Sequence, residues 1–103
     1  MTRSNIGADS RLTALWMLHN AKESALKHAR CMDETKSRIL AALISSDDDA
    51  LAHAAGDYHT AYGNYGVSIE NVRRCAAEID ERWGGAPYEV PAEELEKRAV
   101  LNF

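Results

Sequence analysis

The sequence predicts an all-α protein: a long antiparallel helical hairpin plus a short C-terminal helix. Three observations lead to this fold class. No glycine or proline occurs between Ala8 and Ala55. Apolar residues recur at spacings of three and four on both sides of a short Ser/Asp run, which is the spacing of packed helices. A length of 103 residues fits one domain, so we expect residues 1–103 to form a single helical domain.

The first helix is expected to span about residues 10–44. Asp9 or Ser10 is a suitable N-cap, and Ala, Leu, Lys, Glu, Arg and Met dominate the segment that follows. Its apolar stripe is imperfect because two lysines interrupt it. The stripe consists of Leu15, Leu18, Lys22, Ala25, Ala29, Met32, Lys36, Ile39 and Leu43.

A turn is expected at residues 45–49, where the sequence reads Ser-Ser-Asp-Asp-Asp. Serine and aspartate cap helices, and carboxylates are favourable at a helix N-terminus. The second helix should therefore span about residues 50–83 and end before Gly84 and Gly85. Its stripe is the most regular pattern in the chain and consists of Leu51, Ala55, Tyr58, Tyr62, Tyr65, Ile69, Val72, Ala76, Ile79 and Trp83.

Folding the chain back at residues 45–49 aligns the two stripes in one register. The pairs 43 and 51, 36 and 58, and 29 and 65 all have residue numbers that add up to 94. Large residues often face small ones in this register, as close packing of antiparallel helices requires. The same register predicts that Arg11 lies over the Trp83 ring as a cation–π pair.

The tail is expected to carry a short helix at about residues 92–101, with Pro91 in its first turn. We expect this helix to fold back on the hairpin. A two-helix hairpin buries one stripe of each helix, and the first helix also carries apolar residues outside its stripe, such as Trp16, Met17, Leu26 and Leu40. The tail, a second copy or a larger partner must cover them.

Charge and composition exclude several classes of function. Residues 1–44 carry a net charge of +3 and residues 45–103 a net charge of −7, for a total of −4. This acidity disfavours direct nucleic-acid binding, which needs a basic patch. The longest aliphatic run, Ile39–Ile44, is too short to span a membrane, and residues 1–9 do not form a signal peptide. We therefore expect a cytoplasmic protein without membrane association.

The two cysteines are expected to be free thiols. In the proposed register Cys31 lies near Gly63, about 18 Å along the helix from Cys75. A disulfide requires Cα atoms within about 7 Å. Two cysteines are also too few for a four-thiolate zinc site.

The aromatic residues are the candidate binding groups. Tyr58, Tyr62 and Tyr65 share one helix face, where they would anchor a protein partner or pack inside the hairpin. We expect a partner-binding surface built from Tyr58, Tyr62, Tyr65, Trp16 and Trp83, with Asp80 and Glu81 at its rim. The expected function is a small acidic interaction module, an inhibitor or adaptor that docks on a larger protein assembly of unknown identity.

Two alternatives remain open at this stage. The chain could be a self-associating bundle subunit, including a homodimer, of a secreted or particle-forming assembly. It could also hold a metal or small molecule through His53 and Asp57, which are four residues apart. No catalytic triad, phosphate-binding loop or metal motif is present, so we expect neither an enzyme nor a cofactor.

Overall fold

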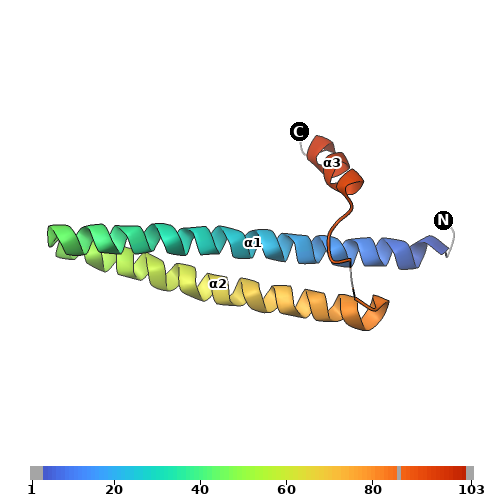
Figure 1. Cartoon of the computed structure of the whole chain (residues 1–103), viewed down its shortest axis with the longest axis horizontal. Coiled ribbons are helices and arrows are strands. Elements are labelled where there is room, and N and C mark those ends of the chain that lie inside the picture. The colour runs from blue at the N-terminus through green and yellow to red at the C-terminus, as the bar shows by residue number, and fades with distance from the viewer. Residues whose placement is uncertain (1–3, 86, 102–103) are drawn as a thin grey trace.

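Two long helices lie side by side in opposite directions, and a third, short helix follows them (Figure 1). The computed structural model describes residues 4–85 and 87–101, and the side chains of residues 10–85 and 87–98. Helix α1 spans Ser4–Ser45, α2 spans Asp48–Trp83 and α3 spans Ala92–Leu101, with no strand in the described residues. The all-α helical hairpin with a short C-terminal helix is confirmed. The molecule is 65 Å long and 18 Å thick.

Helix α1 is longer than predicted at its N-terminus. It begins at Ser4, so the expected cap at Asp9 or Ser10 is wrong. Residues that favour caps are also tolerated inside a helix at a cost below about 1 kcal/mol each, and no proline stops the chain here. A cap residue alone therefore did not mark the end of this helix.

The turn between the long helices is tighter than the expected residues 45–49. Ser46 adopts a left-handed conformation with φ 54°, and the Asp47 amide donates to the Ala42 carbonyl at 3.0 Å. Asp47 then caps α2, its Oδ1 accepting from the Ala50 amide at 3.1 Å. Ser46 thus ends α1 and Asp47 begins α2, and so short a turn makes the two helices antiparallel neighbours.

The expected end of α2 is confirmed. Gly84 has a left-handed φ of 79°, and its amide donates to the Asp80 carbonyl at 3.0 Å. Glycine reaches this conformation without a Cβ clash, which makes it the preferred residue after a helix.

Three cross-helix contacts confirm the antiparallel register to within two residues. The Lys36 Nζ lies 5.9 Å from the Tyr58 ring centroid, as the expected pairing of 36 with 58 requires. Arg38 pairs with Asp57 at 2.9 Å, and the hydroxyls of Ser24 and Ser68 are 3.2 Å apart. The residue numbers of these last two pairs add up to 95 and 92, compared with 94 in the predicted register.

The stripes that face each other are only partly the predicted ones. On α2 the buried residues are Ala54, Ala61, Ser68 and Ile79, whereas the predicted Ala55 and Tyr62 are exposed. On α1 the buried residues are Leu15, Leu18, Ala25, Thr35 and Ala42. The predicted α1 stripe residues Lys22, Lys36 and Leu43 are exposed.

Small side chains explain this shift. Ala42, Ala54 and Ala61 lie between the helices in the half nearer the turn, Ser68 lies just past the middle of α2, and small residues allow two backbones to approach closely. The larger leucine and tyrosine side chains are consequently displaced to the margin of the contact. Thr35 satisfies its buried hydroxyl by donating to the Cys31 and Met32 carbonyls, both at 3.0 Å.

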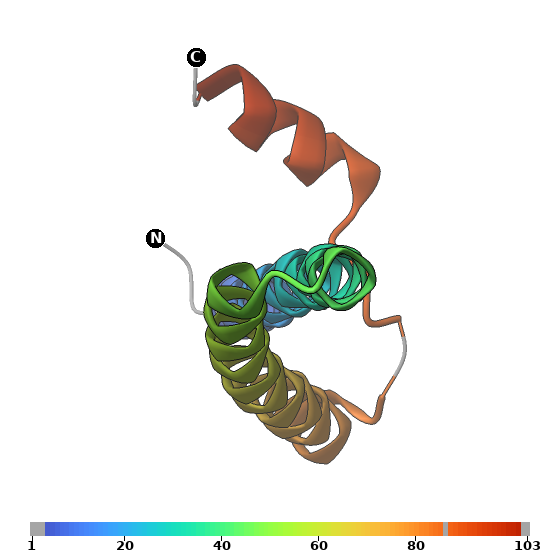
Figure 2. The same cartoon turned by 90° about the vertical axis from the view of Figure 1, so that its left-hand side faces the viewer.

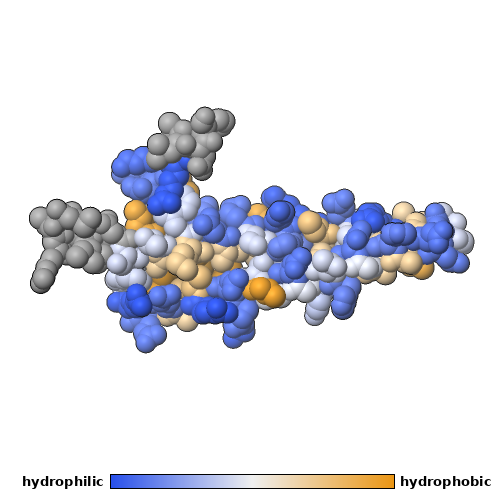
Figure 3. All heavy atoms as spheres, turned by 180° about the vertical axis from the view of Figure 1, so that it is seen from behind, coloured by the Kyte–Doolittle hydropathy of each residue, from blue (hydrophilic) through white to orange (hydrophobic). Residues whose placement is uncertain are grey.

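The apolar core lies at the open end of the hairpin. Leu15, Leu18, Ile79 and Val90 form a buried cluster there, and Ile79 is 0% exposed. Apolar atoms gather between the two rods toward this end (Figure 3). Val90 belongs to the segment after α2. We call residues 84–85 and 87–91 the strap, and its Val90 completes the core where the helices diverge.

The Arg11 side chain of α1 binds the strap, whereas the sequence predicted that it would lie over the Trp83 ring. The Arg11 guanidinium donates to the Gly85 carbonyl at 3.4 Å and to the Pro87 carbonyl at 3.3 Å. The predicted Arg11–Trp83 pair is replaced by Arg82, whose guanidinium lies 6.0 Å from the Trp83 ring. The arginine thus fixes the backbone of the strap, because carbonyl oxygens there lack helical partners.

Helix α3 stands off from the hairpin, as the view along the rods shows (Figure 2). Its described contact with α1 is the Arg98 guanidinium, which lies 4.2 Å from the Trp16 ring centroid. The tail therefore folds back through the strap, with Val90 buried, while α3 covers little of the hairpin.

Candidate interaction face

Two cross-helix contacts divide the hairpin into two faces. Lys36 and Arg38 are two residues apart on α1, so they point about 200° apart around the helix. Lys36 reaches Tyr58 and Arg38 reaches Asp57, and these contacts flank the buried line on opposite sides. We call the Lys36 side the tyrosine face and the Arg38 side the groove face.

The tyrosine face is apolar and exposed. Helical spacing places seven uncharged residues on it, which are Leu26, Leu40 and Leu43 from α1 and Ala55, Tyr58, Tyr62 and Ile69 from α2. Two charged residues of α1 share this face: Lys36, and Asp33, which lies seven residues from both Leu26 and Leu40. Leu40, Leu43 and Tyr62 are 59%, 57% and 60% exposed. Exposed leucine and tyrosine side chains on one face are typical of protein interaction surfaces.

The tyrosines at the centre of this face are ordered by each other and by the neighbouring helix. The rings of Tyr58 and Tyr62 have centroids 6.3 Å apart with planes inclined by 30°. Tyr58 and Tyr65 are half-buried, whereas Tyr62 projects outward. Tyr58 is therefore held between Lys36 and Tyr62, and Tyr62 is the tyrosine most available to a partner.

The other residues predicted for the same surface lie at the open end instead. Trp16 and Trp83 are half-buried and pack against the core cluster. Trp16 also meets His19 edge-on at 5.2 Å, and its indole Nε1 is buried without a hydrogen-bond partner. The structure does not bring the two tryptophans onto the tyrosine face, so they do not form one surface with Tyr62.

The predicted acidic rim is also at the open end. Glu81 is exposed, and Asp80 is exposed but accepts a hydrogen bond from the Tyr88 hydroxyl of the strap. That hydrogen bond, followed by desolvation and the charge of Asp80, raises the pKa of Tyr88 above its usual value. Asp80 therefore helps to hold the strap in addition to presenting a negative charge.

The sequence analysis identified Leu26 and Leu40 as apolar residues outside the stripe that need a cover, but it did not join them to the tyrosines, and it placed Leu43 inside the hairpin. A signal was nevertheless present. Small residues recur every seventh position on α2, at Ala54, Ala61, Ser68 and Cys75. A repeating line of small residues indicates the line of closest helix approach, and the large residues then fall beside it.

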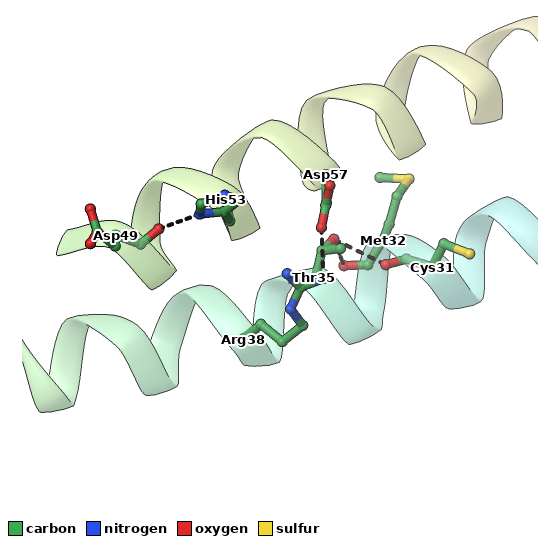
Figure 4. Close-up of polar contacts among 7 residues, drawn as sticks. All are labelled: Cys31, Met32, Thr35, Arg38, Asp49, His53 and Asp57. Atoms are coloured by element: carbon green, nitrogen blue, oxygen red, sulfur yellow. Dashed lines mark hydrogen bonds and ion pairs between the residues drawn. The ribbon is translucent and has the colours of Figure 1, made fainter. Parts of the chain in front are cut away.

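The groove face is polar, and some of its polar groups contact one another (Figure 4). Arg38 and Asp57 form an ion pair across the helices, and His53 Nδ1 is 2.8 Å from the Asp49 carbonyl. A shallow groove there is lined by residues that include Cys31, Glu34, Thr60 and Asn64.

The metal hypothesis based on His53 and Asp57 receives no structural support, because the Asp57 carboxylate is paired with Arg38. Among the described residues, no three histidine, cysteine, aspartate or glutamate side chains are grouped to hold a metal ion. Cys31 and Cys75 are both free thiols, as predicted.

Comparisons with known proteins do not extend this description. No protein-family model, no curated protein sequence and no solved structure matches the chain. Within the described residues, none of the helices is both long and apolar enough to cross a membrane.

Proposed function

We propose that this chain is a small helical protein-interaction module that docks on a larger protein assembly, as an inhibitor or adaptor. The observation that carries the proposal is that the contact between α1 and α2 leaves large apolar side chains of both helices outside it. Leu40, Leu43 and Tyr62 are all exposed on the tyrosine face. The proposal assigns the chain no catalytic step and no cofactor.

The chemistry of the tyrosine face describes the partner. The face offers two leucines and a tyrosine as anchors, so the partner presents an apolar helical surface with pockets for them. Lys36 lies beside the tyrosines and favours a carboxylate on the partner at that edge. The acidic residues Asp80 and Glu81 lie at the far end of the rod, where they would steer approach to a basic region.

The cytoplasm is the proposed location. Two unpaired cysteines within 103 residues support a reducing compartment, because thiols in oxidising compartments are usually paired.

A self-associating bundle subunit is the second candidate function. The total accessible area of 7638 Å² favours it, since a compact protein of 11.4 kDa exposes about 5,800 Å². The surplus belongs to a thin rod whose apolar side has no cover within the described chain.

Affinity capture with three matched baits tests the docking function. The baits are the wild-type chain, Tyr62→Lys and Val67→Lys. Val67 is 64% exposed, similar to Tyr62, but it lies about 140° further around α2 and away from the tyrosine face. Circular dichroism first establishes that all three baits are equally helical.

The expected result is a protein that the wild-type and Val67→Lys baits retain and that Tyr62→Lys loses. The interaction is then measured by calorimetry with that protein purified. Retention of the same proteins by all three baits, or recovery of this chain alone, would contradict docking through the tyrosine face.

A further inference from the structure

We infer that, in the isolated protein, the tyrosine face packs against the same face of a second copy and forms an antiparallel-hairpin four-helix bundle. The inference rests on the proposed function in one respect, because both assign binding to the tyrosine face. It goes further by naming the occupant of that face when the larger partner is absent.

The chain exposes more surface than a compact domain of the same size. The radius of gyration is 19.1 Å, against about 13 Å for a compact domain of this length. The accessible area exceeds that of a compact protein of equal mass by roughly 1,900 Å². A stable dimer buries about 800 Å² on each partner, and the surplus surface of this chain is larger than that.

The tyrosine face has the composition of an interface between protein subunits. Seven of the nine residues that define it are uncharged, and the two charged ones, Asp33 and Lys36, carry opposite charges. The Lys36 stem can lie along apolar surface while its ammonium group stays hydrated. Charged residues are depleted at the centre of stable interfaces, where aromatic side chains are enriched. Tyr62 and Leu43 meet that description better than the groove face does, where Arg38 and Asp57 form an exposed ion pair.

The tyrosine face contains both protrusions and hollows. Leu40, Leu43 and Tyr62 project from it, while Ala55 is small and Gly66 follows Tyr62 by one helical turn. A Cβ added at Gly66 would meet no atom within 4 Å, so that position is open. In a two-fold dimer each copy contributes the same surface, and the protrusions of one copy can enter the hollows of the other.

Competing surfaces are less suitable for a second copy. Ile44 is 76% exposed but lies at the outer side of the turn, away from the contact between the helices. Val67 is an isolated exposed valine on the groove side, flanked by the buried Ser68. Val67 lacks the neighbouring apolar residues that an interface core requires, whereas Ile44 lies one helical turn beyond Leu40 and so extends the tyrosine face toward the turn.

Sedimentation equilibrium on the full chain tests the inference. Wild type is expected to weigh twice 11.4 kDa at high micromolar concentration and to dissociate on dilution. Tyr62→Lys and Leu43→Lys should each raise the dissociation constant at least 30-fold or so, the effect of removing an interface anchor. Val67→Lys should leave it within about threefold of wild type.

Circular dichroism separates loss of association from loss of folding, because both lysine variants keep the helical spectrum if the hairpin is intact. Tyr62→Ser, which adds no charge, serves if Tyr62→Lys fails to fold, and it should also weaken the dimer. A monomeric wild type, or a dimer that Val67→Lys disrupts as strongly as Tyr62→Lys, would overturn the inference. A monomeric wild type that still captures a partner through Tyr62 would leave the proposed function intact.

Discussion

The Lys36 ammonium group lies 5.9 Å from the centroid of the Tyr58 ring, across the contact between α1 and α2. This pair fixes two features at once. It shows the register in which residues 36 and 58 are opposite each other, and it identifies the side of the hairpin to which the tyrosines are displaced. A cation over a tyrosine ring contributes about 0.5–1 kcal/mol at an exposed site, so the pair reports the register more than it creates it.

Ala25→Asp should destabilise the hairpin by at least about 2 kcal/mol, since Ala25 is buried and an aspartate there would be an unpaired charge. Urea unfolding followed by circular dichroism measures the change. Ala77→Asp is the matched control, because Ala77 is exposed, lies away from the tyrosine face and should tolerate the charge. Equal effects at both positions would mean that Ala25 does not face α2.

Ile79→Ala should cost about 2–5 kcal/mol of unfolding free energy, because Ile79 is fully buried between Leu15, Leu18 and the strap. Ile44→Ala, at an exposed isoleucine near the turn, should change the stability by less than about 0.5 kcal/mol. Thermal unfolding at one fixed protein concentration compares them. A small effect of Ile79→Ala would place the main core elsewhere.

Gly63→Ala should stabilise the protein by about 0.5–1 kcal/mol, since Gly63 is inside α2 and has open space around its Cα. Gly84→Ala should have the opposite sign and cost about 1–2 kcal/mol, because Gly84 has a positive φ. Both are read from chemical unfolding curves. If Gly63→Ala were destabilising, α2 would not be regular at that position.

Ser46→Gly should stabilise the turn by up to about 1 kcal/mol, because Ser46 holds a left-handed conformation that glycine adopts without strain. Ser45→Gly makes the same replacement one residue earlier, at the last residue of α1, where the backbone is helical, and should be destabilising by about 0.5 kcal/mol. Differential scanning calorimetry gives both values. A destabilising Ser46→Gly would argue for a different turn conformation.

The Tyr88–Asp80 hydrogen bond should make the folding stability depend on pH in the alkaline range. Its pKa is raised by the hydrogen bond to Asp80, so the folded state binds this proton more tightly than the unfolded state. The stabilisation is therefore complete below the ordinary tyrosine pKa of about 10 and is lost as the pH rises above it. The stability advantage of wild type over Tyr88→Phe should shrink in that range.

Spectrophotometric titration of tyrosinate checks the assignment. The difference between wild type and Tyr88→Phe should have a midpoint above about 10, and Asp80→Asn should lower it. A midpoint unaffected by Asp80→Asn would show that the two side chains do not interact in solution.

Much of the fold follows from the sequence alone. The absence of glycine and proline from residues 9–55 allows one long helix, Asp47 begins the next, and Gly84 ends it. These features depend on backbone conformation and nearby hydrogen bonds, which neighbouring residues decide. The register also follows, because a fold-back of fixed length allows few alignments of two heptad patterns.

The tertiary structure decided how each helix is rotated about its axis. Apolar character made the stripes with Ala55, Tyr62 and Leu43 suitable for the contact, but the line of small residues at Ala54 and Ala61 allows a closer approach. The face of each helix that lies in the contact depends on how the side chains of both helices pack together, so it cannot be read from either segment alone. The tertiary structure also decided the contacts of Val90 with the hairpin core and of Arg11 with the strap. Both contacts join residues that are far apart in the sequence.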